Sequence, residues 1–153
     1  MKMVIALVVL LLVVAGYAVA DDVYHVLCKP EPGNMVYVRS KPRTNAPIVV
    51  WLEFGSSVKT DGKERNGFVH VVDLAAEDVE GWVYAGFLVP DEPMARTYRA
   101  RVNGRVNARK CVDGKRVATL YDGKVVTVYA CSAEWCVTNK GYVMREWLSE
   151  VEP

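Results

Sequence analysis

Hydrophobic residues in this chain come in short runs, rich in β-branched and aromatic side chains, between clusters of turn-forming residues. Such runs are typical of strands, and neither half of the chain beyond the N-terminal apolar stretch shows a sustained helical period. The pattern therefore predicts an antiparallel barrel or sandwich. The strands expected in the first half occupy 23–26, 35–39, 48–54, 58–60, 68–72 and 81–84. Those expected in the second half occupy 98–102, 105–108, 117–120, 125–129, 135–138 and 141–143.

Turn-forming dipeptides punctuate the first half at Asp61-Gly62 and at Asn66-Gly67. The segment 40–47 contains two prolines, which lack the backbone donor that a central strand needs, so we expect an exposed loop there. The polar excursion 73–80 has no counterpart in the second half and is expected to lengthen a hairpin.

The chain repeats itself. Residues 81–88 and 141–148 share the order Gly, aromatic, Val, three variable residues, aromatic, Leu. The spacing Leu-x-x-Gly-x-x-Val begins at Leu52 and again at Leu120. We therefore expect two copies of one small unit. The expected divisions are an N-terminal leader at 1–20, a first unit at 21–90, a linker at 91–96 and a second unit at 97–150.

The first 20 residues have the order of a secretory signal peptide. Lys2 precedes the apolar run 3–14, and the small residues 18–20 precede two aspartates, so cleavage is expected after Ala20. The alternative is an uncleaved anchor, because 3–20 is uncharged and approaches the roughly 20 residues that span a bilayer. Cleavage predicts an exported protein, periplasmic or extracellular, without stable membrane insertion.

Charge excludes one class of partner. The chain has 19 basic and 18 acidic residues, and Lys2 is the only charge in the leader, so cleavage leaves 18 of each sign. A neutral mature chain has no electrostatic footprint for nucleic acid.

The repeated motifs resemble bacterial SH3-type (SH3b) domains. The family's opening strand commonly reads Asn-Val-Arg-Ser-Gly-Pro; residues 37–42 keep its Val, Arg, Ser and Pro, and residues 107–112 keep its Asn and Arg. The resemblance implies two consecutive small SH3-like β-barrels, without enzymatic activity or a cofactor. It further implies a binding module for peptidoglycan or its peptides in the cell envelope. The alternative that it leaves open is a protein–protein interaction module for an extended peptide.

All four cysteines follow the expected cleavage site, where an oxidising compartment would let them pair. Cys131 and Cys136 flank a predicted turn, and neighbouring strands there would bring their Cα atoms within disulfide range. Cys28 and Cys111 would then form the second pair. Three connectivities are possible, and this is the one we expect.

Two other chemistries would use the same residues. Zinc could take the cysteines with His25 or His70, but an exported chain favours oxidation and the spacing matches no common zinc finger. A Cys–His nucleophile pair would need a histidine in a recognisable catalytic setting, and both histidines are expected to be ordinary strand residues. Lipidation of Cys28 is not expected, because large residues precede it. The sequence thus predicts neither metal nor catalytic residues.

Aromatic side chains are the remaining candidates for contacting a ligand. Four in the closing motifs are expected in the core: Trp82, Phe87, Tyr142 and Trp147. Four others are expected to line a ligand groove: Tyr37, Trp51, Tyr84 and Tyr121. Strand alternation supports this for Tyr37 and Tyr84, whose neighbours Val38 and Val83 would face the core. Exposed rings of this kind can stack on a peptide or a sugar.

Overall fold

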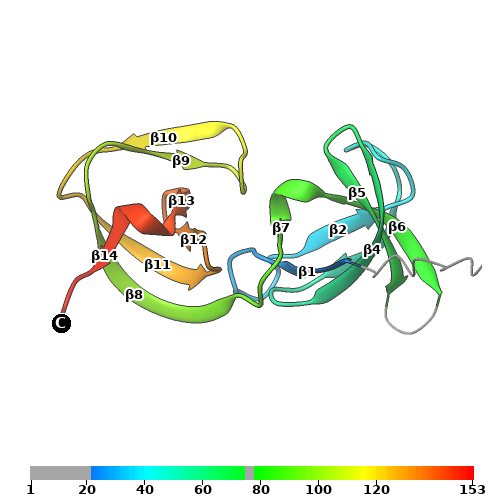
Figure 1. Ribbon diagram of the computed structural model, residues 1–153, viewed down its shortest axis with the longest axis horizontal. Coiled ribbons are helices and arrows are strands. Elements are labelled where there is room, and N and C mark those ends of the chain that lie inside the picture. Colours follow the sequence, from blue (N-terminus) through cyan, green and yellow to red (C-terminus); the bar gives the residue numbers. More distant parts are fainter. Residues whose placement is uncertain (1–21, 75–77) are drawn as a thin grey trace, which may run out of the picture.

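The computed structural model describes residues 22–74 and 78–153. The expected signal peptide and its cleavage site lie outside these residues. The described chain is almost entirely β-structure, arranged as two barrels side by side, with the C-terminus at the far end of the second barrel (Figure 1).

The first barrel is one seven-stranded antiparallel sheet with strand order β3-β2-β6-β5-β4-β1-β7. Its strands are β1 (Asp22–Val26), β2 (Val36–Arg39), β3 (Ile48–Leu52), β4 (Ser57–Arg65), β5 (Phe68–Leu74), β6 (Val79–Tyr84) and β7 (Leu88–Val89). A single 3-10 turn, η1 (Ala85–Phe87), connects β6 to β7.

The second barrel has the corresponding order β10-β9-β13-β12-β11-β8-β14. Its strands are β8 (Met94–Val102), β9 (Val106–Arg109), β10 (Arg116–Leu120), β11 (Val125–Cys131), β12 (Trp135–Thr138), β13 (Gly141–Met144) and β14 (Leu148–Glu150). Its 3-10 turn, η2 (Arg145–Trp147), lies at the position of η1 in the repeat. The expected fold class, all-β with two consecutive SH3-like barrels, is confirmed.

Local differences from the expected elements have simple causes. Asp61-Gly62 does not end a strand: it lies inside β4, where the register with β5 shifts between Thr60 and Glu64 and Gly62 has a φ of 81°. These are the marks of a β-bulge. The expected turn at Asn66-Gly67 is present, with positive φ at both residues. Strand β8 begins at Met94, inside the segment expected to be linker.

Each barrel has its own core, built from the inward residues of alternating strands. Val38, Val58, Val71 and Val83 are among the fully buried side chains of the first barrel. The core of the second barrel includes five fully or almost fully buried residues: Ala108, Val126, Val128, Cys136 and Val143. Some side chains of the second core are smaller than their counterparts in the first, such as Ala108 at the position of Val38, although the strand order is the same.

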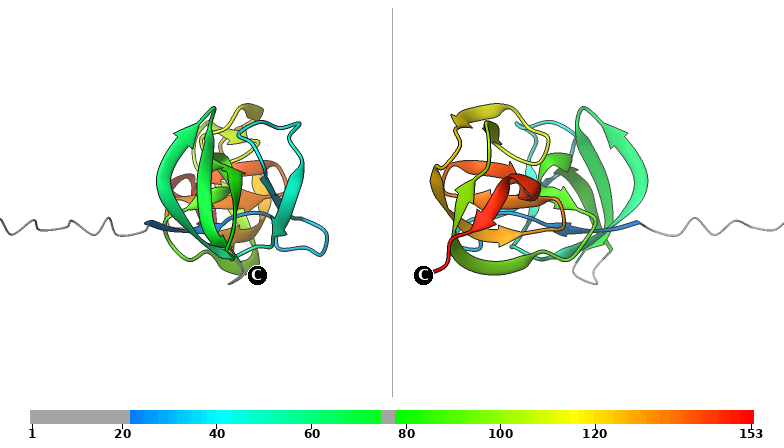
Figure 2. Two further views of the ribbon diagram at one scale, coloured as in Figure 1. Left: turned by 90° about the vertical axis from the view of Figure 1, so that its right-hand side faces the viewer. Right: turned by 60° about the vertical axis from the view of Figure 1, so that its left-hand side comes forward.

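A third apolar cluster joins the two barrels. Leu27 and Val89 of the first barrel pack with Trp135, Val137 and Tyr142 of the second, and all five are buried. In the end-on view of Figure 2 one barrel lies behind the other. In Figure 1 the segment after β1 extends toward the second barrel. Burial of this cluster favours a fixed arrangement of the two units.

No helix within 22–74 and 78–153 has the length and apolar character needed to cross a bilayer.

Candidate ligand-binding groove

Two of the four aromatic residues expected to bind ligand meet in one cavity. Tyr37 on β2 and Tyr84 at the end of β6 line a pocket of about 360 Å³, which we call the aromatic groove. Their side chains are 45% and 39% exposed, while Val38 and Val83 beside them are fully buried. Strand alternation therefore places both rings on the outer surface, as the sequence predicts.

The floor of the aromatic groove is itself aromatic. The Tyr84 ring packs edge-on against Phe68, with centroids 5.4 Å apart, and against Phe87 at 6.1 Å. Both phenylalanines also line the groove. Gly67, with a φ of 78°, leaves room for the Tyr84 ring, because a Cβ there would lie 3.2 Å from ring carbon Cε2. These contacts hold the Tyr84 ring in place before any ligand arrives.

Trp51 extends this surface without lining the groove. It is directly opposite Tyr37 in the β2–β3 ladder, so the two side chains share one face of the sheet. With 59% of its surface exposed, Trp51 is more open than Tyr37. The pair forms an aromatic platform at the edge of the groove.

The wall of the aromatic groove carries three cationic residues that the sequence reasoning did not select. Arg39, the Arg of the opening-strand motif, lies with its guanidinium 5.5 Å from the Tyr37 ring centroid and donates to the carbonyl of Ala46. Lys110 and Lys115 come from the second barrel. No carboxylate lines the groove among the residues that the structure describes. The groove therefore has a positive wall beside aromatic rings.

The loop 110–115, between β9 and β10, delivers both lysines to the first barrel. Inside the loop, the Lys110 amide donates to the Lys115 carbonyl, and Arg109 donates to the carbonyl of Gly114. Across the interface, the Val112 amide donates to the carbonyl of Gly86 in η1 at 2.9 Å. The two barrels thus build the groove together.

Tyr121 does not join the groove. It is exposed on the second barrel, 6.0 Å from the guanidinium of Arg105. The repeat explains why the second barrel has no matching aromatic surface. The residues corresponding to Tyr37, Trp51 and Tyr84 are Asn107, Thr119 and Met144. The aromatic rings that line the groove thus come from the first barrel alone.

The residues expected in the core behave differently from one another. Tyr142 is buried, whereas Trp82 and Phe87 are half-buried. The expectation for Trp147 is wrong: it is 39% exposed and lies over Gly104 at the open end of the second barrel. Phe87, at the corresponding position of the repeat, is covered by the partner barrel, and Trp147 has no such cover in the described chain.

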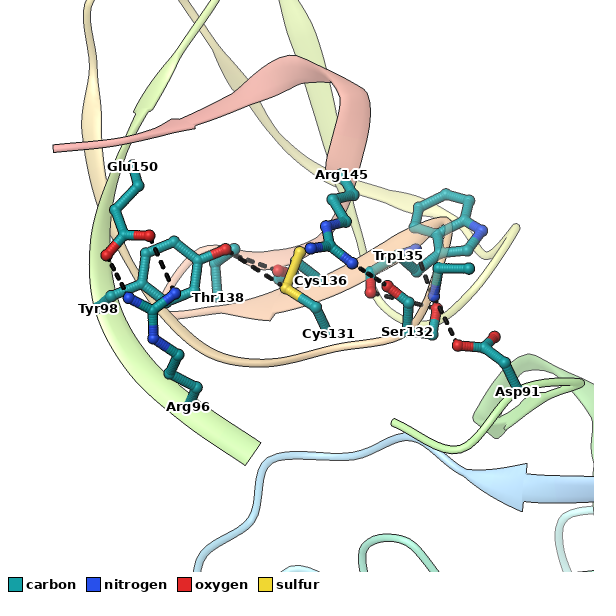
Figure 3. The surroundings of a disulfide bond; sticks show 12 residues. Asp91, Arg96, Tyr98, Cys131, Ser132, Trp135, Cys136, Thr138, Arg145 and Glu150 are labelled. Carbon is teal, nitrogen blue, oxygen red and sulfur yellow. Dashed lines mark hydrogen bonds and ion pairs between the residues drawn. A yellow bond between two sulfur atoms is a disulfide. The ribbon is translucent and has the colours of Figure 1, made fainter. Parts of the chain in front are cut away.

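The cysteines are paired as expected only in part. Cys131 and Cys136 lie opposite each other in the β11–β12 ladder and form a disulfide (Figure 3). The expected bond between Cys28 and Cys111 is wrong, because both are free thiols. Cys28 belongs to the core of the first barrel, and burial raises its pKa to about 11. Both thiols are buried, so they are poor nucleophiles and poor metal ligands.

His70 is paired with an aspartate and packs against a tryptophan. His70 is buried, its Nδ1 lies 2.8 Å from Asp61 Oδ2, and its ring rests 4.9 Å from that of Trp82. In the described residues no hydrogen bond joins His25 or His70 to a cysteine or a hydroxyl group. Nor do the described residues include a group of three or more side chains that could hold a metal ion.

Comparison with known proteins identifies a family for part of the chain. Residues 34–89 match the family model of the bacterial SH3 domain. This part of the chain is a bacterial SH3 domain. It contains β2 through β7 and, with them, Tyr37, Trp51, Tyr84 and Arg39. A search of curated proteins found no match.

Two solved structures resemble the tandem. NlpC2 from Trichomonas vaginalis is 18% identical over 85% of this chain, with a TM-score of 0.35. NlpC1 from the same organism is 18% identical over 85% of the chain, with a TM-score of 0.32. The chain spans about half the length of each, 48% and 46%.

The geometry of the aromatic groove suits one kind of ligand. Exposed tyrosine rings offer flat faces and hydroxyl groups that fix orientation. Arginine binds a carboxylate through paired N–H groups, and lysine does so as a point charge. A short, extended molecule that carries a carboxylate matches both features of this SH3 domain.

Proposed function

We propose that the protein is an exported, non-enzymatic binding module that recognises peptidoglycan, or its peptides, through the aromatic groove of the first SH3 domain. One observation carries the proposal: Tyr37 and Tyr84 converge on a pocket whose only charged lining residues, within the described chain, are Arg39, Lys110 and Lys115. Peptidoglycan peptides are short, extended and rich in carboxylates. Their chemistry therefore complements both the rings and the cations.

Two further observations support export and a binding role. The Cys131–Cys136 disulfide fits an oxidising compartment, which agrees with the expected signal peptide. In the described residues neither histidine is hydrogen-bonded to a hydroxyl or thiol group, and the two free thiols are buried. Binding needs only the concave, partly apolar surface that the groove provides.

Co-sedimentation with purified sacculi tests this function. The chain from Asp21 onward should sediment with sacculi, and Tyr37→Ala or Tyr84→Ala should release it into the supernatant. Tyr121→Ala is the matched control, because Tyr121 is an exposed tyrosine outside the groove. Since Tyr84 also packs on Phe68, thermal unfolding must show that each variant is folded. Folded variants that still sediment like the unaltered protein would refute the groove.

A second candidate function rests on the edge strand β3. This strand ends the first sheet and exposes Ile48, Val49 and Trp51. An open strand edge with apolar side chains can accept an extended peptide of a partner protein as an added strand. One stoichiometric protein recovered from envelope extract, together with no binding to sacculi, would favour this function.

A further inference from the structure

A second cavity lies beside the aromatic groove, between the two barrels. It has a volume of about 570 Å³, and we call it the interbarrel cavity. Leu88 and Val89 of the first barrel and Val112 and Trp135 of the second give it apolar walls. Tyr84 lines both this cavity and the aromatic groove. The two hollows therefore adjoin at the Tyr84 ring.

The two hollows have opposite charge. The interbarrel cavity is lined by Asp91, Asp113 and Glu134, and by no lysine or arginine among the described residues. The loop 110–115 borders both hollows, with its lysines on the groove and Asp113 on the cavity. The charged side chains on one side of this loop are thus basic, and those on the other side are acidic.

The carboxylates of the interbarrel cavity are open to a ligand. Asp113 and Glu134 form no ion pair or hydrogen bond through their side chains in the part of the chain that the structure describes. Asp91 accepts the Ala133 amide on one oxygen at 2.7 Å. Arg145 of η2 donates to the Ser132 carbonyl from the side of the disulfide, whereas Asp91 approaches from the other side (Figure 3).

Trp135 gives the interbarrel cavity an aromatic wall. Its side chain is 95% buried, with 5% exposed, and it lines the interbarrel cavity. Its indole N–H donates to no acceptor in the described residues and is not among the fully enclosed atoms, so it stays accessible. An accessible indole N–H can donate to a carbonyl group of a peptide that enters the cavity.

The wall that holds Trp135 is rigid. The disulfide closes the hairpin 131–136, and inside it the Trp135 amide donates to Ser132 Oγ at 3.0 Å while the Ser132 amide donates to the Trp135 carbonyl (Figure 3). An aromatic ring beside several carboxylates is the usual setting for an ammonium group, which gains from both.

We propose that the interbarrel cavity is a second subsite of the same groove, which binds a protonated amine of the peptide whose carboxylate lies against Arg39, Lys110 and Lys115. This inference rests on the proposed function and makes it more specific. A peptidoglycan stem peptide has such an amine on its diamino acid only while that amine is not cross-linked. The protein therefore prefers uncross-linked peptide.

Calorimetry with two model peptides tests the subsite. The first is Nα-acetyl-Lys-D-Ala-D-Ala, with a free ε-amine; the second is the Nα,Nε-diacetyl form, in which that amine is a neutral acetamide. The unaltered protein should bind the free amine about tenfold more tightly, which corresponds to about 1.4 kcal/mol. Equal affinity for the two peptides would overturn the subsite and leave carboxylate recognition standing. Failure to bind either peptide, together with no binding to sacculi, would overturn the subsite and the proposed function together.

The variant Asp113→Asn/Glu134→Gln tests whether the carboxylates of the interbarrel cavity cause the preference for the free amine. It should bring the ratio of the two affinities close to one and leave the affinity for the diacetyl peptide unchanged. Asp113 has a φ of 52°, a conformation that asparagine tolerates, so the loop should keep its shape. Glu146→Gln is the matched control, because Glu146 is an exposed glutamate on the same barrel outside both hollows. A tenfold ratio that survives in the double variant would overturn the assignment of the cavity.

Discussion

The Tyr142 hydroxyl donates a hydrogen bond of 2.7 Å to the backbone carbonyl of Leu27, and so joins the second barrel to the first. Both residues are buried in the cluster between the barrels. Burial also raises the pKa of Tyr142, so the hydroxyl keeps its proton and remains a donor. This contact fixes the relative position of the barrels and hence the geometry of the aromatic groove, which needs residues from both.

Tyr142→Phe should destabilise the protein by about 1 to 3 kcal/mol. The substitution keeps the ring but leaves the buried Leu27 carbonyl without its donor. Urea unfolding followed by tryptophan fluorescence measures the change. Tyr121→Phe removes an exposed hydroxyl and should shift stability by less than about 0.5 kcal/mol. Equal small effects of the two substitutions would show that the interface does not depend on this bond.

Gly86→Ala should weaken the contact between η1 and the loop 110–115. A Cβ at Gly86 would lie 2.5 Å from Cys111 Sγ and 2.9 Å from Tyr84 Cε1. Overpacking of this kind costs about 1 to 3 kcal/mol. Glu146→Ala, at the corresponding exposed position of the repeat, is the control and should be nearly neutral.

A double-mutant cycle identifies the clash at Gly86. Replacing Cys111 with alanine removes the sulfur atom, so Gly86→Ala should cost clearly less in that background. Additive effects of the two substitutions, measured by urea unfolding, would contradict a direct contact between the two positions.

Sequence periodicity predicted the side-chain directions within each strand but could not predict contacts between the barrels. Tyr37 and Tyr84 were found because their strand neighbours face inward, and that pattern is local. Lys110 and Lys115 reach the groove only because the second barrel docks against η1. In the sequence, the only sign of a cationic wall was a pair of lysines on either side of a Gly-containing turn. Such a pair normally indicates a solvated loop.

The error over Cys28 and Cys111 has the same origin. Once Cys131 and Cys136 are paired, elimination leaves these two for each other. However, the structure assigns Cys28 to the core of its own barrel, while Cys111 Sγ occupies the space left by Gly86 and Gly114. Where a side chain packs is decided by the tertiary fold, and a count of cysteines contains no such information.

Thiol chemistry should follow this burial. The native protein should react slowly with a thiol reagent, the denatured protein should show two thiols, and the denatured and reduced protein four. Replacing Cys131 and Cys136 together with alanine should cost about 2 kcal/mol by the chain-entropy estimate for so short a loop. Denatured, unreduced protein without free thiols would contradict the assignment of Cys28 and Cys111.

Stability should fall at alkaline pH. Burial raises the pKa of Cys28 from 9.0 to about 11, so the unfolded thiol ionises before the folded one. The contribution of this thiol to the free energy of unfolding is therefore complete below pH 9. As the pH rises toward 11 the free energy of unfolding falls by on the order of 2 kcal/mol. Tyr142, whose pKa is also raised, adds a loss of the same sign at higher pH. Urea unfolding of the protein and of Cys28→Ala at pH 8 to 11 measures this; parallel pH profiles would contradict it.

Removal of the two lysines contributed by the second barrel should weaken binding to the first. Lys110→Gln/Lys115→Gln leaves the rings of the aromatic groove intact but takes away two of its three cations. Affinity for a peptide with a free carboxylate should fall by about one order of magnitude, and affinity for the matching carboxamide should hardly change, since only the charged form gains from the lysines.

Added salt should reduce carboxylate binding in the unaltered protein more than in the variant, because exposed charges are screened. Lys124→Gln/Lys140→Gln, at exposed positions outside the groove, is the charge-matched control. An equal loss in both double variants would point to net charge, and no loss in either would mean that the second barrel only supports the groove without contacting the ligand.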